Sequence, residues 1–255
     1  MPEDPTALFR LDGKVALLTG ASSGLGRRFA EVLSAAGATV VVAARRAAAL
    51  EELAATLPGV VAVPTDVTVE SELAHLVEET VGRFGRVDVL VNNAGAVAVV
   101  PALEEEPASF RRILEVNVTA PFVLSQLVAR HMVSDGGGTI VNVASVLGLI
   151  ASGRIPQASY SASKGALVNL TRELAAQWAD KGVRVNALAP GWFASEMTAE
   201  MFASERGRRF IERNTPMGRA GEEGELDGAL LFLASPASSF VTGQVLCVDG
   251  GWTIV

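Results

Sequence analysis

The stretch Val15-Ala16-Leu17-Leu18-Thr19-Gly20-Ala21-Ser22-Ser23-Gly24-Leu25-Gly26 passes from an apolar run into a glycine-rich turn, and a helical pattern follows through Ala36. A short apolar run suits a strand that is buried on both faces of a parallel sheet. Strand, glycine-rich turn and helix together can hold a pyrophosphate, because the helix N-terminus offers free N–H groups and glycines let the backbone approach. The spacing G-x-x-x-G-x-G departs from the G-x-G-x-x-G fingerprint, so a plain glycine-rich β–α turn stays open at this point.

The same alternation of apolar runs and helical patterns continues along the chain without a linker, repeat or low-complexity break. It predicts one α/β domain over residues 1–255: a doubly wound, Rossmann-type fold with a seven-stranded parallel sheet and helices on both faces. After the first run, the expected strands are 38–43, 60–63, 87–91, 140–144, 183–188 and 245–248.

Residues 192–217 interrupt this alternation and mix large apolar side chains, such as Trp192 and Met197, with charges. Apolar residues on a segment above a cleft are typical of a substrate lid. A plain amphipathic helix packed on the body of the domain is the alternative interpretation.

Composition excludes several classes of function. The net charge is −7, and Lys and Arg form no cluster, which argues against a nucleic-acid partner. One cysteine, Cys247, excludes an internal disulfide, and two distant histidines make a metal site improbable. The short polar N-terminus and the absence of a long apolar run predict a cytoplasmic protein without a membrane segment.

Tyr160 and Lys164 stand four residues apart, so a helix would place them on one face. Tyr160 is the only tyrosine of the chain. A neighbouring ammonium favours the phenolate, which predicts a tyrosine pKa lowered towards neutrality and a phenol that exchanges a proton with an alcohol oxygen. The alternative is a half-buried tyrosine beside a solvated lysine.

The end of the second expected strand carries Arg45 and Arg46, and the next acid is Glu51. A cofactor-binding fold distinguishes a ribose hydroxyl from a 2′-phosphate at this place, and arginine suits the phosphate. The sequence therefore predicts NADP, with Arg45 as the main phosphate ligand and Arg46 as a candidate second, and NAD is less favoured. Two solvated arginines are the alternative, although cations are unfavourable at a helix N-terminus unless an anion offsets them.

Polar residues also follow other strands. Asp66 could accept from an adenine amino group or cap the next helix. Ser145 follows the fifth expected strand, at the edge where parallel sheets bind ligands. Asn117 lies inside a helix expected over 107–131, where an asparagine is unfavourable unless its side chain has a task, such as a hydrogen bond to a neighbouring strand.

With these residues assembled, the chain resembles the short-chain dehydrogenase/reductase family, in its branch of about 250 residues, over positions 10–255. The resemblance implies that Tyr160 is the general acid or base and that Lys164 lowers its pKa and holds the nicotinamide ribose. It implies that Ser145 binds the substrate oxygen and that Asn117 positions a water linked to Lys164. The motifs that carry the resemblance are residues 19–26, Asp66, Asn92-Asn93-Ala94-Gly95, Asn117, Ser145, Tyr160-x-x-x-Lys164, Pro190-Gly191 and 249–252.

The resemblance also implies a cofactor cleft, lined by Asn92 and Gly95 among others, with the carboxamide held by Ser195 and by backbone near Phe193. The loop from Val146 to Ser159, which contains Arg154, is longer than in many members. The predicted cofactor contacts are Gly20, Ser22, Ser23, Gly24, Leu25, Gly26, Arg45, Arg46, Asp66, Val67, Asn93, Ala94, Gly95, Tyr160, Lys164, Pro190, Gly191, Phe193 and Ser195.

The leading hypothesis is an NADP-dependent oxidoreductase that moves a hydride between nicotinamide and a secondary alcohol or ketone. The apolar lid weakly favours a hydrophobic ketone. A 3-oxoacyl carrier-protein reductase would use Arg206, Arg208 and Arg209 near the lid, and a sugar-acid dehydrogenase would need Arg154 in its pocket. An NADP-binding regulator without catalysis is the alternative from another class.

The family resemblance further implies a homotetramer or homodimer, formed through the helix of Tyr160 and the helix at about 222–234. The second helix carries Leu226, Leu230, Leu231 and Leu233, which suggests more apolar surface than one contact requires.

Overall fold

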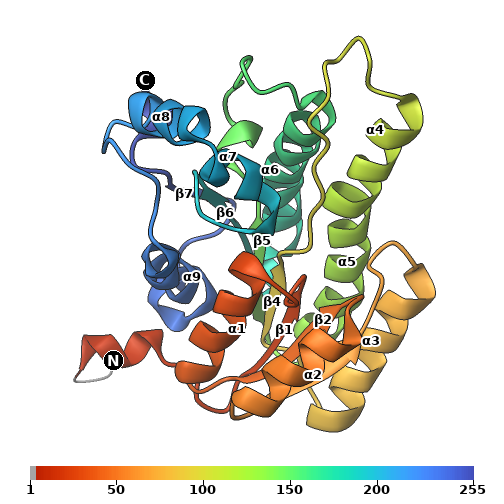
Figure 1. Cartoon of the computed structure of the whole chain (residues 1–255). Coiled ribbons are helices and arrows are strands. Elements are labelled where there is room, and N and C mark those ends of the chain that lie inside the picture. Colours follow the sequence, from red (N-terminus) through yellow and green to blue (C-terminus); the bar gives the residue numbers. More distant parts are fainter. Residues whose placement is uncertain (1–3) are drawn as a thin grey trace.

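A parallel sheet of seven strands forms the centre of the computed structural model, which describes residues 4–255 (Figure 1). The strand order is β3-β2-β1-β4-β5-β6-β7, and every neighbouring pair is parallel. The predicted fold class is confirmed, and strand ends differ from the prediction by one or two residues. The strands are β1 (Val15–Thr19), β2 (Thr39–Ala44), β3 (Val60–Pro64), β4 (Val89–Asn92), β5 (Gly138–Val143), β6 (Val183–Pro190) and β7 (Val245–Val248).

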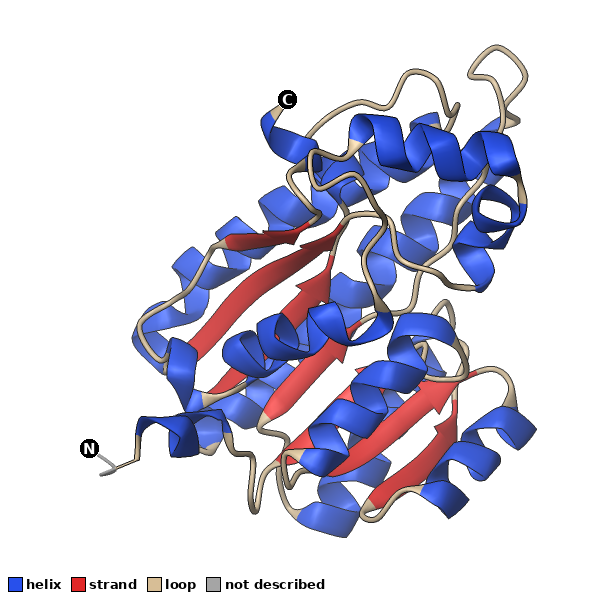
Figure 2. Cartoon of the chain, turned by 60° about the vertical axis from the view of Figure 1, so that its left-hand side comes forward, coloured by secondary structure: helices blue, strands red, loops and turns tan. Residues whose placement is uncertain are grey.

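Helices cover both faces of this sheet (Figure 2). Within β1, Ala16 and Leu18 belong to one hydrophobic cluster and Leu17 to the other, because successive side chains point to opposite faces. All of β1 is buried, and its first four residues are apolar rather than alternating, as a strand covered on both faces requires. One face carries α1 (Gly24–Ala35), α2 (Ala47–Thr56) and α9 (Asp227–Ala234); the other carries α3 (Glu70–Phe84), α5 (Ala120–Ser134) and α6 (Ala158–Trp178).

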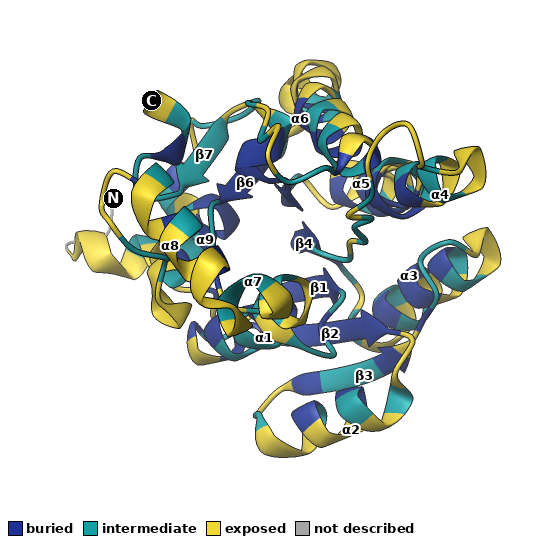
Figure 3. Ribbon diagram, turned by 45° about the horizontal axis from the view of Figure 1, so that its top comes forward, coloured by how far each residue is buried: buried dark blue, intermediate teal, exposed yellow. Residues whose placement is uncertain are grey.

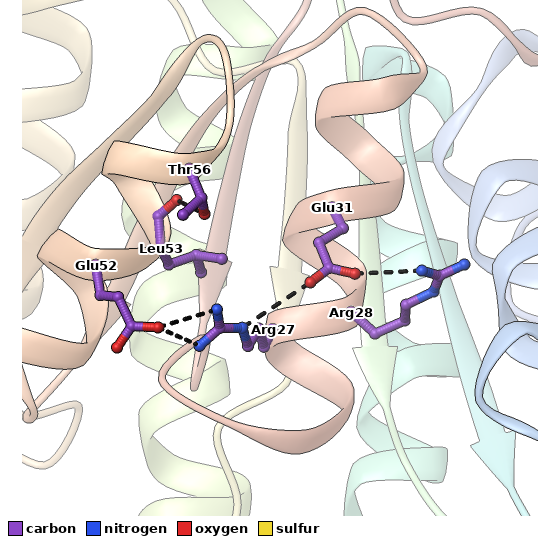
Figure 4. Close-up of polar contacts among 6 residues, drawn as sticks. All are labelled: Arg27, Arg28, Glu31, Glu52, Leu53 and Thr56. Atoms are coloured by element: carbon purple, nitrogen blue, oxygen red, sulfur yellow. Dashed lines mark hydrogen bonds and ion pairs between the residues drawn. The ribbon is translucent and has the colours of Figure 1, made fainter.

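Ion pairs run along α1 and join it to α2 (Figure 4). Both terminal nitrogens of Arg27 lie 3.2 Å from Glu52 Oε1 on α2, and Arg28 Nη1 lies 3.2 Å from Glu31 Oε2. Arg28 also pairs with Asp227 at the start of α9. Partly exposed pairs contribute little each, but together they orient the helix whose N-terminus follows the glycine-rich turn.

The helix predicted over 107–131 is two helices, and this prediction needs correction. α4 (Pro107–Leu114) is separated from α5 by a π-helical turn, η2 (Glu115–Thr119), which contains Asn117. Pro121 has no N–H to donate to the carbonyl of Asn117, four residues earlier, so the regular bonding pattern cannot continue there. The turn instead closes a bond from the Ala120 N–H to the Glu115 carbonyl.

Residues 192–217 pack on the body of the domain through a few buried side chains. Phe193 and Ile211 are buried, as a packed segment requires. The helices of this segment expose much of their surface (Figure 3). They are η5 (Glu196–Thr198), α7 (Ala199–Ala203) and α8 (Glu205–Asn214).

The leucines near the C-terminus pack differently from the prediction. Leu226, Leu230 and Leu233 are buried in the protein's own core, so they add no exposed apolar surface. All four residues of the edge strand β7 are partly exposed instead. Phe240, in the loop before β7, is fully exposed.

No helix among residues 4–255 is both long and apolar enough to cross a bilayer.

Candidate active site and cofactor cleft

A cleft of about 780 Å³ opens at the carboxyl ends of the central strands. All nineteen predicted cofactor contacts line it, as does Ser145, while Asn117 lies buried beneath it. The sequence did not predict the other lining residues: Ala44, Thr65, Ala96, Val97, Arg112, Val116, Val143, Ala144, Glu196, Met197 and Thr198.

The glycine-rich turn is built to take an anion. Gly20 and Gly24 have φ values of 70° and 51°, which favour glycine. Ser23, the residue before α1, makes no side-chain hydrogen bond to the helix N-terminus. The first turn of α1, which lies within the described residues, carries no acidic side chain. The N–H groups of this turn are thus available to a pyrophosphate, so the residues fit a dinucleotide.

Close packing supports this turn from within. A Cβ added at Gly26 would collide with the carbonyl oxygen of Gly20. Asn93 Nδ2 donates to the carbonyl of Thr19 at 2.9 Å, which holds the end of β4 against the turn.

Tyr160 and Lys164 lie near each other on the first turns of α6. The Lys164 Nζ is 5.6 Å from the centroid of the Tyr160 ring and donates to the Val143 carbonyl at 2.7 Å. Lys164 is 4% exposed, which excludes the alternative of a solvated lysine. Ser145 follows β5, and its Oγ accepts from the Leu147 N–H at 3.2 Å.

The sequence predicted a lowered pKa for Tyr160, but in the protein without cofactor the shift has the opposite direction. Burial raises the pKa of the phenol above its ordinary value, and Ser145 opposes this only in part. Burial also lowers the pKa of Lys164 to about 8. Loss of hydration on burial is the largest cause of both pKa shifts.

Asn117 ties three segments together below the cleft. Its Oδ1 accepts from the Ala96 N–H and its Nδ2 donates to the Ala96 carbonyl, both at 2.8 Å, and Nδ2 also donates to Ser163 Oγ at 2.9 Å. The side chain is fully buried. A Cβ added at Gly95 would lie 3.6 Å from Asn117 Oδ1 and 3.7 Å from Lys164 Nζ, so this glycine keeps open the space above both groups.

Asn92 does not line the cofactor cleft, contrary to the expectation. It is buried and donates to Ser125 Oγ at 3.0 Å and to Asn142 Oδ1 at 2.8 Å. Successive side chains of a strand point to opposite faces, so Asn92 joins the core while Asn93 turns to the cleft.

The end of the cleft that is predicted to hold the adenosine carries Asp66 and the two arginines. Asp66 Oδ1 accepts from the N–H and the hydroxyl of Thr68, and these bonds lower the pKa of its carboxyl. The residue that precedes α3 is Val69, so the helix-cap reading of Asp66 is wrong. Arg45 is exposed at the rim, and Arg46 pairs with Glu196 at 3.0 Å.

Glu196 is the main charged group that sequence reasoning missed at this end. It lies 150 positions from Arg46, and only the fold brings the two together. Arg112 was missed as well; its Nη1 donates to Thr68 Oγ1 at 3.1 Å beside Asp66. Spacing along the chain carried no signal for either residue.

Comparisons with known proteins agree with this geometry. A family model described as Enoyl-(Acyl carrier protein) reductase matches residues 20–253. A galactitol 2-dehydrogenase (L-tagatose-forming) of Cereibacter sphaeroides is 45% identical over 98% of this chain and 99% of its own. A gluconate 5-dehydrogenase of Gluconobacter oxydans is 42% identical over 97% of both chains.

A solved structure extends the likeness to three dimensions. The gluconate 5-dehydrogenase from Burkholderia cenocepacia, in complex with NADP and tartrate, superimposes with a TM-score of 0.94. It is 37% identical and covers 99% of this chain and 100% of its own.

Proposed function

We propose that this chain, which belongs to the short-chain dehydrogenase/reductase family, is an NADP-dependent dehydrogenase of a neutral polyol. As a member of that family it is an oxidoreductase acting on CH–OH and C=O groups. The observation that carries the proposal is the meeting of Ser145, Tyr160 and Lys164 in the cleft that begins at the glycine-rich turn.

In this proposal the protein orients the substrate and moves one proton. The phenol of Tyr160 gives a proton to the carbonyl oxygen in reduction and takes it from the hydroxyl in oxidation. Ser145 holds the same oxygen, and Lys164 holds the nicotinamide ribose and stabilises the phenolate. Nicotinamide supplies or accepts the hydride when it is bound.

The preference for NADP is supported by the charge at the end of β2. Arg45 and Arg46 line the cleft there, where an acidic residue would repel a 2′-phosphate. The gluconate 5-dehydrogenase of B. cenocepacia was solved as a complex with NADP. Arginine remains charged and can bond a phosphate through two nitrogens.

The proposed substrate class is supported by the substrates of the relatives and by the positions of the arginines. The relatives named above act on galactitol and gluconate, which are polyhydroxylated. The arginines that line the cleft, Arg45, Arg46 and Arg112, all lie at its adenosine end, and Arg154 is exposed on its loop. A substrate carboxylate near Tyr160 therefore has no arginine partner among the described residues, which favours a neutral polyol over a sugar acid.

An aromatic cluster stands beside Tyr160. Trp192 packs edge-on against Phe210 and Trp252, with ring centroids 6.4 and 5.8 Å away. Aromatic faces can pack against the C–H side of a sugar chain, and they equally suit a hydrophobic ketone, which is the second candidate substrate.

The remaining alternatives are weaker. Arg208 donates to carbonyls of α7 and Arg209 pairs with Glu205, so two of the three arginines expected to meet an acyl carrier are engaged within the lid. A 3-oxoacyl thioester stays in the test panel. The regulator without catalysis is set aside, since the family relationship makes the chain an enzyme.

The test measures NADP⁺ reduction with galactitol, other polyols and gluconate, and NADPH oxidation with ketones and a 3-oxoacyl thioester. NAD⁺ and NADH run in parallel. We expect turnover with a polyol, faster with NADP⁺, and its loss in Tyr160→Phe while NADP⁺ affinity is kept. Full activity of Tyr160→Phe would overturn the mechanism, and preference for gluconate would overturn the choice of a neutral substrate.

In this proposal residues 192–217 form the substrate lid. The enzyme acts in the cytoplasm. We further propose a homotetramer or homodimer in which the partly exposed strand β7 takes part. An apolar edge strand that stays uncovered invites pairing, so a partner copy would cover it.

A further inference from the structure

The lid places a carboxylate on Arg46, one of the two arginines that the proposed function assigns to the 2′-phosphate. Glu196 begins η5, and its Oε1 and Oε2 lie 3.0 and 3.1 Å from the terminal nitrogens of Arg46. This is the two-point geometry with which an arginine also binds a phosphate.

The glycine-rich turn contributes to the same cluster. Arg46 donates to Ser22 Oγ at 3.1 Å and to Ser23 Oγ at 2.6 Å, and Ser23 Oγ donates to Glu196 Oε2 at 2.9 Å. The bond from Arg46 holds the pKa of Glu196 below its ordinary value, so the carboxylate is charged at neutral pH. The Glu196 carboxylate thus occupies hydrogen-bond donors of Arg46 and Ser23, two residues that line the cleft.

We propose that Glu196 is a cofactor-specificity residue, which competes with the 2′-phosphate of NADP for Arg46 and Ser23 and leaves NAD unaffected. The inference rests on the proposed function, because it assumes that the 2′-phosphate binds at Arg46. NADP must displace the carboxylate, whereas the 2′-hydroxyl of NAD does not need these donors.

The exposure of the pair sets the size of the effect. The side chains of Arg46 and Glu196 are 52% and 65% exposed, so water and salt screen their attraction. Displacement is therefore easy, and Glu196 weakens NADP binding without preventing it. A carboxylate that stayed nearby would also repel the phosphate, which adds to the discrimination.

The place of Glu196 in the chain links this competition to the lid. Ser195, the residue expected to hold the carboxamide, directly precedes it, and a Cβ added at Gly24 would lie 3.2 Å from the Ser195 Cβ. The first turn of the lid is thus fastened to the glycine-rich turn through Glu196. A phosphate that takes over Arg46 would release this fastening.

The test compares Glu196→Gln with Glu200→Gln, a matched control on the same lid, since Glu200 is exposed on α7. Titration calorimetry on the full chain measures adenosine 2′,5′-bisphosphate and 5′-AMP, which report the adenosine end alone. We expect Glu196→Gln to bind the bisphosphate roughly two- to fivefold more tightly, with 5′-AMP changed less than about 1.5-fold. Glu200→Gln should match the wild type, and added salt should shrink the gain.

The outcomes separate the two ideas. If the wild type prefers the bisphosphate and Glu196→Gln behaves like Glu200→Gln, the inference is overturned and the NADP assignment stands. If neither the wild type nor Glu196→Gln distinguishes the bisphosphate from 5′-AMP, the 2′-phosphate does not bind at Arg46, and both fail. Equal thermal unfolding midpoints of the three proteins show that the comparison concerns binding.

Discussion

Lys164 is a buried cation, and its burial opposes folding. Its pKa falls from 10.5 to about 8, a difference that corresponds to roughly 3 kcal/mol of unfolding free energy near neutral pH. We expect Lys164→Met to abolish turnover and yet to unfold at a temperature no lower than the wild type. The bond to the Val143 carbonyl is lost, which offsets part of the gain. Thermal unfolding of Lys164→Met is measured beside the wild type and Tyr160→Phe, a second inactive variant. A large drop in the unfolding midpoint of Lys164→Met would contradict the expectation.

The same shift gives a pH dependence with a definite sign. Between about pH 8 and 10.5 the unfolded chain holds a proton on Lys164 that the folded protein has released. Unfolding therefore takes up a proton, and stability from this group rises with pH. Relative to Lys164→Met, the wild type should gain about 2 kcal/mol between pH 7.5 and 9.5 in urea titrations. An equal pH response of both proteins would show that Lys164 titrates normally.

At the residue scale, the sequence predicted groups whose spacing is local and missed groups that only the fold assembles. Tyr160 and Lys164 could be placed together because one helical turn separates them. Their pKa directions could not be predicted, since burial and the Val143 carbonyl are tertiary features. Glu196 meets Arg46 across 150 residues, which no periodicity reveals.

At the scale of elements, the π-helical turn η2 depends on the side chain of Asn117. Asn117→Ala would leave the N–H and carbonyl of Ala96 without their partner at a buried site. We expect a loss of about 2–4 kcal/mol in unfolding free energy, measured by urea denaturation. Asn169→Ala, at an exposed position of α6, should change it by less than about 0.5 kcal/mol. A loss below about 1 kcal/mol for Asn117→Ala would show that other groups replace these bonds.

Gly26 in α1 has no room for a side chain, whereas Gly82 in α3 has. Gly26→Ala would force its methyl group onto the Gly20 carbonyl and distort the turn, so we expect lower stability and weaker NADP⁺ binding. Gly82 in α3 has open space around its Cβ position, and Gly82→Ala should stabilise by about 0.5–1 kcal/mol. Melting curves and NADP⁺ titrations of both variants test these expectations. Unchanged NADP⁺ affinity in Gly26→Ala would contradict the role of the glycine-rich turn.

The elements themselves were largely predictable, because a fully buried parallel strand has an apolar sequence and glycine marks its end. The helix break at η2 was not, since Pro121 can also stand in the first turn of a helix and its consequence for Asn117 is a tertiary matter. The packing of Leu226, Leu230 and Leu233 inward likewise followed from the position of α9 on the sheet rather than from composition.

At the scale of the whole molecule, the exposed apolar edge predicts association of copies. Phe240 is fully exposed just before β7, and we expect Phe240→Asp to weaken the proposed oligomer. Light scattering after size exclusion should give two or four times 26.5 kDa for the wild type and a smaller mass for the variant. Leu103→Asp, on a distant loop with the same exposure, serves as the control. A wild-type mass of one chain would refute the assembly.

The strand order also governs how the polypeptide is made. β1 pairs with β2 on one side, but its other neighbour is β4, where Ala16 meets Val89. Val89 lies 73 positions after Ala16, so at a synthesis rate of 5–20 residues per second it emerges roughly 4–15 s later. Before β4 emerges, a nascent β1-β2-β3 unit leaves one edge of β1, a strand that is buried throughout in the fold, without a partner. Until β4 appears, the ribosome-bound chain therefore exposes an unpaired edge that can aggregate and that a chaperone could shield.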